Sequence, residues 1–378
     1  MSLVQSLYSA PALHLLSQRP DHPVLYFAPS ILQATARRFL AGFPGLVTYA
    51  VKANDAVEVL ENLMAAGIEA FDVASPFEMA RVKALMPSAV LHYNNPVRSE
   101  AEIKTAVGYG VGSYSVDSMG ELAKLVRFGV PRSAEVTVRL RLPVKGAAYD
   151  FGAKFGADPA LAVELLKAVS DAGFVASMTF HPGTQCADPD AWRAYIDICA
   201  DVARGAGVSL RRLNVGGGYA SHRTGPAPDL EAIFGVIERA ADRAFAGAVP
   251  DLVCEPGRAM VAEAFSLATR VKAIREDGAV FLNDGIYGGL AEMPILGNID
   301  RIESVSPEGA RNGAPVQHVV FGPTCDSLDR LPGMVPFPGD LAEGDWVLWH
   351  GLGAYSTATV TRFNGYGEIE VVTTDRLA

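Results

Sequence analysis

The sequence predicts an α/β protein in which a (β/α)8 barrel of the TIM type is followed by an antiparallel β domain. Between about residues 24 and 264, short runs rich in β-branched and aromatic residues alternate with amphipathic helical stretches. This alternation is typical of a parallel sheet whose strands are joined by helices. After residue 264 no long helical period is visible, and strand-like runs follow one another, as in an antiparallel sheet.

Eight of the early runs are predicted to be parallel strands, which is the number that a closed βα barrel requires. They lie at 47–51, 70–74, 90–93, 113–116, 136–142, 177–181, 213–215 and 252–254. Ser30, Ser75 and Ser118 each stand three residues before a Gln or Glu, the spacing of a helix capping box. We therefore expect helices to begin at these three serines.

The later runs predict a β domain of about a hundred residues. They lie at 265–274, 279–282, 317–321, 346–349, 357–361 and 368–372. The expected domains are therefore a barrel at 24–264 and a β domain at 265–378, with residues 1–23 joining the β domain.

Composition excludes several classes of function. The 378 residues are 49% hydrophobic, so the chain can bury a large core. It carries 32 Lys and Arg against 42 Asp and Glu, a net charge of −10, which works against a nucleic-acid partner. Nothing resembles a membrane span or an export signal, so we expect a cytoplasmic protein. The four scattered cysteines and seven histidines form no metal-binding or disulfide pattern.

Chemically active side chains stand where predicted barrel strands end, which is the face that carries function in βα barrels. Lys52 follows the first strand, Asp72 the second and His181 the sixth. Taken singly, each has an ordinary structural explanation: a solvated lysine, a helix-capping aspartate and a hydrogen-bonded core histidine.

Two further segments follow the seventh and eighth strands. Three consecutive glycines at 216–218 allow backbone amides to approach an anion, although they also suit a tight turn. Glu255 and Arg258 flank a Pro-Gly corner, where they could form a structural ion pair. One barrel face would thus gather an amine, an imidazole, a phosphate cradle and an acid with an arginine. This combination predicts a pyridoxal 5'-phosphate site.

With these motifs in place, the chain resembles the fold-type III pyridoxal-phosphate decarboxylases, the group of ornithine, lysine and diaminopimelate decarboxylases. The resemblance covers nearly the whole chain. It rests on five segments, at 49–54, 180–184, 216–218, 255–258 and 353–356. The segment 322–329, Gly-Pro-Thr-Cys-Asp-Ser-Leu-Asp, is more similar to the ornithine branch, because diaminopimelate decarboxylases usually have glutamate in place of its cysteine.

The resemblance implies a role for each motif residue. Lys52 would hold the cofactor covalently, Asp72 would pair with it, His181 would stack on its ring, and Glu255 would keep the ring nitrogen protonated. The phosphate would be bound by Gly217, Gly218, Arg258 and Tyr355, with Thr184 a further candidate.

The resemblance also implies a homodimer with two shared sites. Cys325 would return a proton to the substrate carbon, and Asp326 would bind the distal amine of the substrate, both in the site of the partner subunit. Relatives acting on ornithine often carry an aspartate eight residues beyond a Tyr-Gly pair, where this chain has Leu296. Glu292 is the nearest substitute. We expect decarboxylation of L-ornithine to putrescine, ahead of L-lysine to cadaverine.

Three alternatives stay open from the sequence. Diaminopimelate decarboxylase belongs to the same group of enzymes. An alanine-racemase-like activity would use the same architecture, but its base is normally a tyrosine where this chain offers Cys325. A regulatory protein that only binds pyridoxal phosphate is the non-enzyme alternative.

Overall fold

The computed structural model describes residues 8–143, 148 and 152–378, and these form two compact units. The barrel unit comprises Thr35–Ala220 and Pro228–Gly257. The β unit comprises the residues up to Ala34, the short segment Ser221–Ala227 and Arg258–Ala378.

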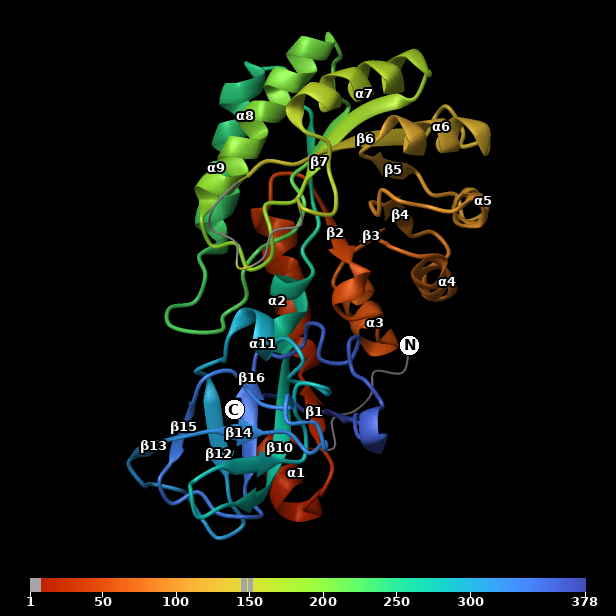
Figure 1. Ribbon diagram of the computed structural model, residues 1–378. Helices are drawn as coiled ribbons and strands as arrows, with labels where there is room; N and C mark the ends of the chain where they lie inside the picture. Colours follow the sequence, from red (N-terminus) through yellow and green to blue (C-terminus); the bar gives the residue numbers. More distant parts are fainter. Residues whose placement is uncertain (1–7, 144–147, 149–151) are drawn as a thin grey trace. The chain divides into compact units, whose positions relative to one another are not determined.

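Eight parallel strands close the barrel, in the order β2 to β9 along the chain (Figure 1). They are β2 (Leu46–Ala50), β3 (Ala70–Asp72), β4 (Val90–Tyr93), β5 (Ser113–Val116), β6 (Glu135–Leu140), β7 (Val175–Phe180), β8 (Arg212–Asn214) and β9 (Asp251–Cys254). Strands β2 and β9 close the ring in the register Leu46 with Val253 and Val47 with Cys254. The predicted barrel is therefore confirmed, and all eight predicted runs are barrel strands.

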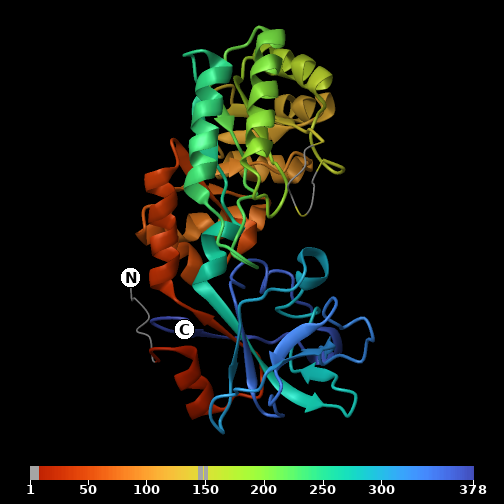
Figure 2. The same ribbon diagram turned by 90° about the vertical axis from the view of Figure 1, so that its left-hand side faces the viewer.

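Helices cover the outside of the barrel, with α7, α8 and α9 side by side (Figures 1 and 2). They are α2 (Pro29–Gly42), α3 (Val57–Ala65), α4 (Pro76–Leu85), α5 (Glu100–Gly108), α6 (Met119–Arg127), α7 (Pro159–Asp171), α8 (Pro189–Ala206) and α9 (Leu230–Phe245), and a 3-10 turn, η1 (Val51–Ala53), follows β2.

Two of the three predicted helix caps are confirmed. Ser75 and Ser118 accept hydrogen bonds from the backbone N–H three residues on. The prediction for Ser30 is wrong, because α2 already begins at Pro29. A complete capping box stands instead at the start of α5, between Ser99 and Glu102.

The β unit is built around a sheet with the strand order β12-β16-β10-β1-β17, in which β11 also pairs with β10 and β14 pairs with β11. Figure 2 shows this unit from a second direction. Its strands are β1 (Val24–Phe27), β10 (Phe265–Ile274), β11 (Val280–Leu282), β12 (Ile302–Val305), β13 (Pro315–His318), β14 (Val320–Phe321), β15 (Val335–Pro338), β16 (Trp346–His350) and β17 (Glu370–Thr373). Its short helices are α1 (Pro11–Gln18), α10 (Arg258–Val261), η2 (Ala262–Ala264), α11 (Met293–Leu296) and η3 (Phe363–Gly365).

Several details differ from the prediction for this unit, and the predicted run 317–321 is divided between β13 and β14. Most strand pairs are antiparallel, but β1 with β17 and β11 with β14 are parallel. The run 357–361 forms turns instead of a strand. Strand β1 pairs with β10 in the β unit, so the barrel unit begins at Thr35 and not at the expected residue 24.

The core of the β unit explains why residues before the barrel belong to it. Tyr26 on β1 is fully buried in one cluster with Leu15 of α1 and with Trp346 and Leu348 of β16. The Trp346 indole donates to the carbonyl of Pro20 at 3.2 Å. Within the described residues, no helix combines the length and the apolar character needed to span a membrane.

Barrel closure yields a prediction about Gly45. A Cβ at this position, just before β2, would lie 2.2 Å from the Leu252 carbonyl oxygen of β9. Because backbone must move to admit it, we expect Gly45→Ala to lower the melting temperature by about 5 °C or more in thermal denaturation. Gly112→Ala, just before β5, is the matched control, since its Cβ would meet nothing within 4 Å. Equal melting temperatures for the two variants would contradict this reading of the closure.

Candidate active site

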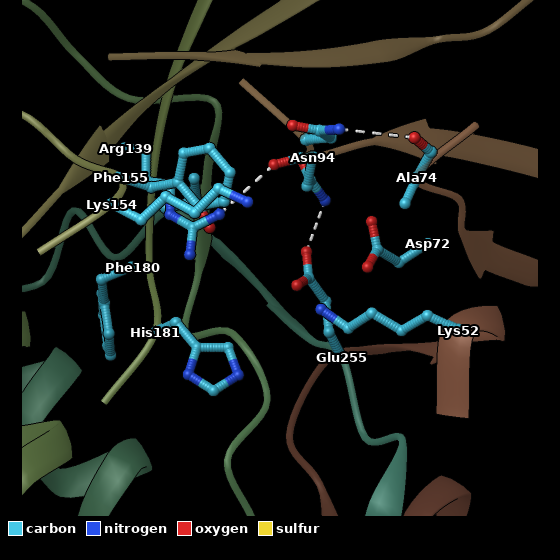
Figure 3. A pocket seen from close by; sticks show the side chains of 12 residues that line it. Lys52, Asp72, Ala74, Asn94, Arg139, Lys154, Phe155, Phe180, His181 and Glu255 are labelled. Carbon is cyan, nitrogen blue, oxygen red and sulfur yellow. Dashed lines mark hydrogen bonds between the residues drawn. The ribbon is translucent and has the colours of Figure 1, made fainter. Parts of the chain in front are cut away.

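A cavity of about 210 Å³ lies within the barrel unit, and most of its lining residues stand at or just beyond the carboxyl ends of the strands (Figure 3). Its lining residues are Lys52, Asp72, Ala74, Asn94, Asn95, Arg139, Lys154, Phe155, Thr179, Phe180, His181 and Glu255. The structure therefore brings together four of the predicted site residues: Lys52, Asp72, His181 and Glu255.

Lys52 lies in the 3-10 turn that directly follows β2. The turn is anchored from the strand, because the buried Tyr49 hydroxyl donates to the Asn54 carbonyl oxygen at 2.8 Å. In Figure 3 the Lys52 side chain extends toward Glu255 and His181. Lys52 as a whole is solvent-exposed.

Two carboxyls are buried in the cavity wall. Asp72 ends β3 and is 7% exposed, and Glu255 follows β9 and is 8% exposed. Burial raises the pKa of both, and the nearby Asp72 raises the pKa of Glu255 further, to about 8. Lys52 and Arg139 oppose the rise at both groups. The site thus holds two carboxyls whose ionisation depends on the cations around them.

His181 follows β7 and contributes a neutral ring. Burial, followed by the charges of Lys52 and Arg139, holds its pKa well below the ordinary value of 6.5. The Nδ1 atom accepts a hydrogen bond from the Gly183 backbone at 3.1 Å, which places the ring proton on Nε2. An uncharged imidazole can stack on a flat ring without adding a positive charge to the cavity.

The glycine run passes so close to its neighbours that no side chain fits. A Cβ on Gly217 would lie 2.6 Å from the Glu255 carbonyl oxygen and 3.3 Å from Nε2 of His181. A Cβ on Gly218, whose φ is +85°, would lie 2.3 Å from the Gly183 carbonyl oxygen. The next helix, α9, begins only at Leu230, so an anion here would be bound by loop amides and not by a helix terminus.

Sequence reasoning missed several polar residues of this site, among them Asn94, Asn214 and Arg139. Asn94 directly follows β4, and Asn214 ends β8, so the strand-end rule that found Lys52 also applies to both. Arg139 is a charged residue between Val138 and Leu140 near the carboxyl end of β6, which is a signal of a functional polar group. The amides of Asn94 and Asn214 both donate to Glu255 Oε1.

Five predicted site residues lie in the β unit, in two clusters. Arg258, 8% exposed, makes a bidentate pair with Glu292, with both N–O distances 2.5 Å. Its guanidinium also lies 5.0 Å from the centre of the Tyr355 ring. The two predicted phosphate ligands therefore contact each other, and Glu292, the expected partner of a substrate amine, is engaged by Arg258.

The second cluster contains Cys325 and Asp326. Cys325 is an exposed free thiol whose backbone N–H donates to Asn364 Oδ1 at 3.0 Å. Asp326 accepts hydrogen bonds from the Tyr287 hydroxyl at 2.5 Å and from the Leu328 backbone at 2.9 Å, and the Tyr287 bond lowers its pKa. Asp326 therefore presents a negative charge near the surface of this unit.

Comparisons with known proteins decide the family. A family described as "Pyridoxal-dependent decarboxylase, pyridoxal binding domain" matches residues 30–262. This chain belongs to the pyridoxal-dependent decarboxylases. Its cofactor is pyridoxal phosphate, and it is an amino-acid decarboxylase.

Individual relatives support this family assignment. Ornithine decarboxylase of Panagrellus redivivus is 30% identical, over 92% of this chain and 84% of its own length. The arginine decarboxylase of Paramecium bursaria Chlorella virus has a TM-score of 0.86 at 26% identity, over 95% of this chain and 98% of the other. A lysine/ornithine decarboxylase of Vibrio vulnificus, complexed with cadaverine, has a TM-score of 0.83 at 26% identity, over 98% and 100% of the two chains.

The cavity of this decarboxylase fits its cofactor. Asp72 Oδ1 is buried without a hydrogen-bond partner, so a polar group entering the cavity would find an acceptor there. Gly217 packs directly beside two groups of the cavity wall, because a Cβ there would lie 3.3 Å from His181 Nε2 and 2.6 Å from the Glu255 carbonyl oxygen. In the described residues, no cluster of His, Cys, Asp and Glu suits a metal ion.

The raised pKa of Glu255 predicts the pH dependence of stability. The carboxyl has a pKa of about 8 when folded, against 4.5 ordinarily. Between these values the unfolded chain releases a proton that the folded apoprotein keeps, so stability falls as pH rises through this window. Glu255→Gln, which resembles the protonated form, should make the apoprotein more stable than the parent at pH 9 by on the order of 2 kcal/mol. The difference should vanish near pH 4.5, measured by urea denaturation.

Exposed Glu69→Gln is the control, and its stability should follow that of the parent at both pH values. If Glu255→Gln does not raise the free energy of unfolding at pH 9, then ionisation of Glu255 destabilises the folded apoprotein very little.

Proposed function

We propose that this protein decarboxylates a basic L-amino acid, converting ornithine to putrescine in preference to lysine to cadaverine. The observation that carries the proposal is the convergence of Lys52, Asp72, Glu255 and His181 on one cavity, in a chain of the pyridoxal-dependent decarboxylase family. Relatives that act on ornithine or lysine support the substrate class.

Each residue of the cavity has a distinct task. Bound pyridoxal phosphate supplies an electron sink for the charge left on the substrate Cα when CO₂ departs. The Lys52 amine holds the cofactor covalently, and Glu255 keeps a proton on the ring nitrogen. His181, neutral and half-buried, would stack on the ring, and Asp72 would pair with the cofactor. Burial of Asp72 and Glu255 strengthens the electrostatic interactions that these two carboxyls make.

The phosphate is assigned to the amides of Gly217 and Gly218 together with Arg258 and Tyr355, with Thr184 a further donor. The bidentate pair between Arg258 and Glu292 supports the choice of arginine, because a guanidinium that binds a carboxylate in this way binds a phosphate in the same geometry. Phosphate binding then requires Arg258 to share or exchange its present partner.

Asp326 and Cys325 complete the substrate end. Asp326 binds the distal ammonium group of the substrate, and Cys325 returns a proton to Cα after CO₂ has left. Glu292, engaged by Arg258, is the second acid for the ammonium group only if that pair opens. Asp326 therefore has the leading role in substrate binding.

The protein is proposed to work as a homodimer in the cytoplasm, with Cys325 and Asp326 reaching the partner's cavity. Leu328, on the same loop, is an apolar side chain that is 71% exposed, and the proposed dimer would bury it. The four free cysteines support a reducing compartment.

The substrate proposal is tested on the purified protein. We expect a visible absorption band from the bound cofactor and CO₂ release with ornithine at a higher kcat/KM than with lysine, arginine or diaminopimelate. Lys52→Ala should lose at least ~10³-fold in CO₂ release together with the band, because the covalent link is gone. A preference for diaminopimelate, or racemisation of a single enantiomer without CO₂, would reject the proposal.

Shared sites make a separate prediction. Lys52→Ala and Asp326→Ala should each be inactive. When equal amounts of the two variants exchange subunits, about half of the dimers are mixed, and each mixed dimer contains one site with both native residues. The mixture should therefore regain about a quarter of the parent activity. Activity of the mixture is compared with that of each variant alone, and the mass is measured by sedimentation. A dimer without any recovery would place Lys52 and Asp326 of one site on the same chain.

A further inference from the structure

We propose that Asn94 and Asn214 are positioning residues that hold the Glu255 carboxylate ionised and oriented toward the ring nitrogen of the cofactor, an inference that rests on the proposed role of Glu255. Both side-chain amides donate to the same carboxylate oxygen, Oε1. All three residues are at least nine-tenths buried, so water does not replace these donors. In the described part of the chain, these are the hydrogen bonds that reach the carboxylate.

The orientation of Asn214 is set by the glycine run. Its Oδ1 accepts a hydrogen bond from the Gly216 backbone at 2.9 Å, so Nδ2 must point the other way, toward Glu255. The same turn also binds the Glu255 backbone, whose N–H donates to the Gly216 carbonyl oxygen at 2.9 Å. The run therefore positions both the donor and the acceptor.

Asn94 is held by the strands beside it. Its carbonyl oxygen accepts from the Ser115 hydroxyl at 2.7 Å. One guanidinium nitrogen of the buried Arg98 donates to the carbonyl oxygens of Tyr93 at 2.6 Å and Ser115 at 2.7 Å, which ties the ends of β4 and β5 together. This network fixes the backbone from which the Asn94 amide reaches Glu255.

The surrounding charges explain why neutral amides suit this position. Glu255 faces Asp72 on β3, which disfavours its ionised form, and Lys52 after β2 and Arg139 on β6, which favour it. Further cations at positions 94 and 214 would neutralise the carboxylate and compete with a protonated ring. Amide donors stabilise the negative charge without cancelling it. With Oε1 doubly bonded, Oε2 is the acceptor left for the ring N–H.

The first test needs no cofactor. In the apoprotein, the carboxyl band of Glu255 can be followed against pH by infrared difference spectroscopy, with Glu255→Gln identifying the band. Asn94→Ala and Asn214→Ala should each raise the pKa of Glu255 by about one unit, and the double variant by more, because a charge-assisted hydrogen bond is lost at each step. Asn94→Leu and Asn214→Leu fill the space that Ala leaves and so keep water out of it.

Asn283→Ala is the matched control. Asn283 is also a buried asparagine with two hydrogen bonds, to the Arg270 backbone at 2.8 Å and the Asp21 carbonyl at 2.9 Å, but it lies in the β unit. It reproduces the structural cost of losing a buried amide. The Glu255 band should titrate in this variant as in the parent.

The second test uses the holoenzyme loaded with pyridoxal phosphate labelled with ¹⁵N in the ring. The parent and Asn283→Ala should show a protonated ring nitrogen by NMR. The double variant should shift this signal toward the unprotonated form and bind the cofactor at least ~10-fold more weakly. An unchanged Glu255 titration and ring signal in the double variant would overturn the inference. An unprotonated ring in the parent would instead reject the proposed role of Glu255, while the infrared titration would still report on the two amides.

Discussion

The burial of two carboxyls in one enclosed space is the constraint on which the site depends. Asp72 and Glu255 each lose hydration, and the charge of one disfavours the charge of the other, so both have raised pKa values. Lys52 and Arg139 compensate in part, and the amides of Asn94 and Asn214 add hydrogen bonds. A ring that carries a proton and a positive charge supplies what this arrangement lacks. The cavity is thereby adapted to a protonated cofactor before the cofactor arrives.

The closed barrel is what brings these groups together. Lys52 and Glu255 follow the first and last strands of the ring, far apart in the sequence, yet β2 and β9 are neighbours. The pairing of β2 with β9 continues beyond β9, because the Ala50 backbone N–H donates to the Pro256 carbonyl oxygen at 3.2 Å. A shift in the pairing of β2 with β9 would move the Lys52 amine relative to the Glu255 carboxyl. The tight contact at Gly45 thus serves the chemistry as well as the fold.

The sequence alone predicted the barrel because every strand-helix unit is local, and it predicted Lys52, Asp72, His181 and Glu255 because each ends a strand. Asn94 and Asn214 obey the same rule but went unnoticed, because asparagine at a strand end is commonplace in turns. Pairing of β1 with β17 joins distant parts of the chain and leaves no local pattern. The contact of Arg258 with Glu292 likewise exists only after the β unit has folded. The sequence therefore predicted chemically active residues at strand ends, but it did not predict which distant segments pair or which side chains contact each other.

The same balance of charges indicates which acid is available to the distal ammonium group of the substrate. Hydrogen bonds from the Tyr287 hydroxyl and the Leu328 backbone favour the anionic form of Asp326. Glu292 is paired with Arg258, and Leu296 carries no charge. Among the candidate acids in the described chain, Asp326 is then the one proposed to bind the distal ammonium. A single acid at this end would separate ornithine from lysine only weakly, because one methylene changes discrimination by a small amount. Strong selection for chain length would require a second acid, which in this chain means releasing Glu292 from Arg258.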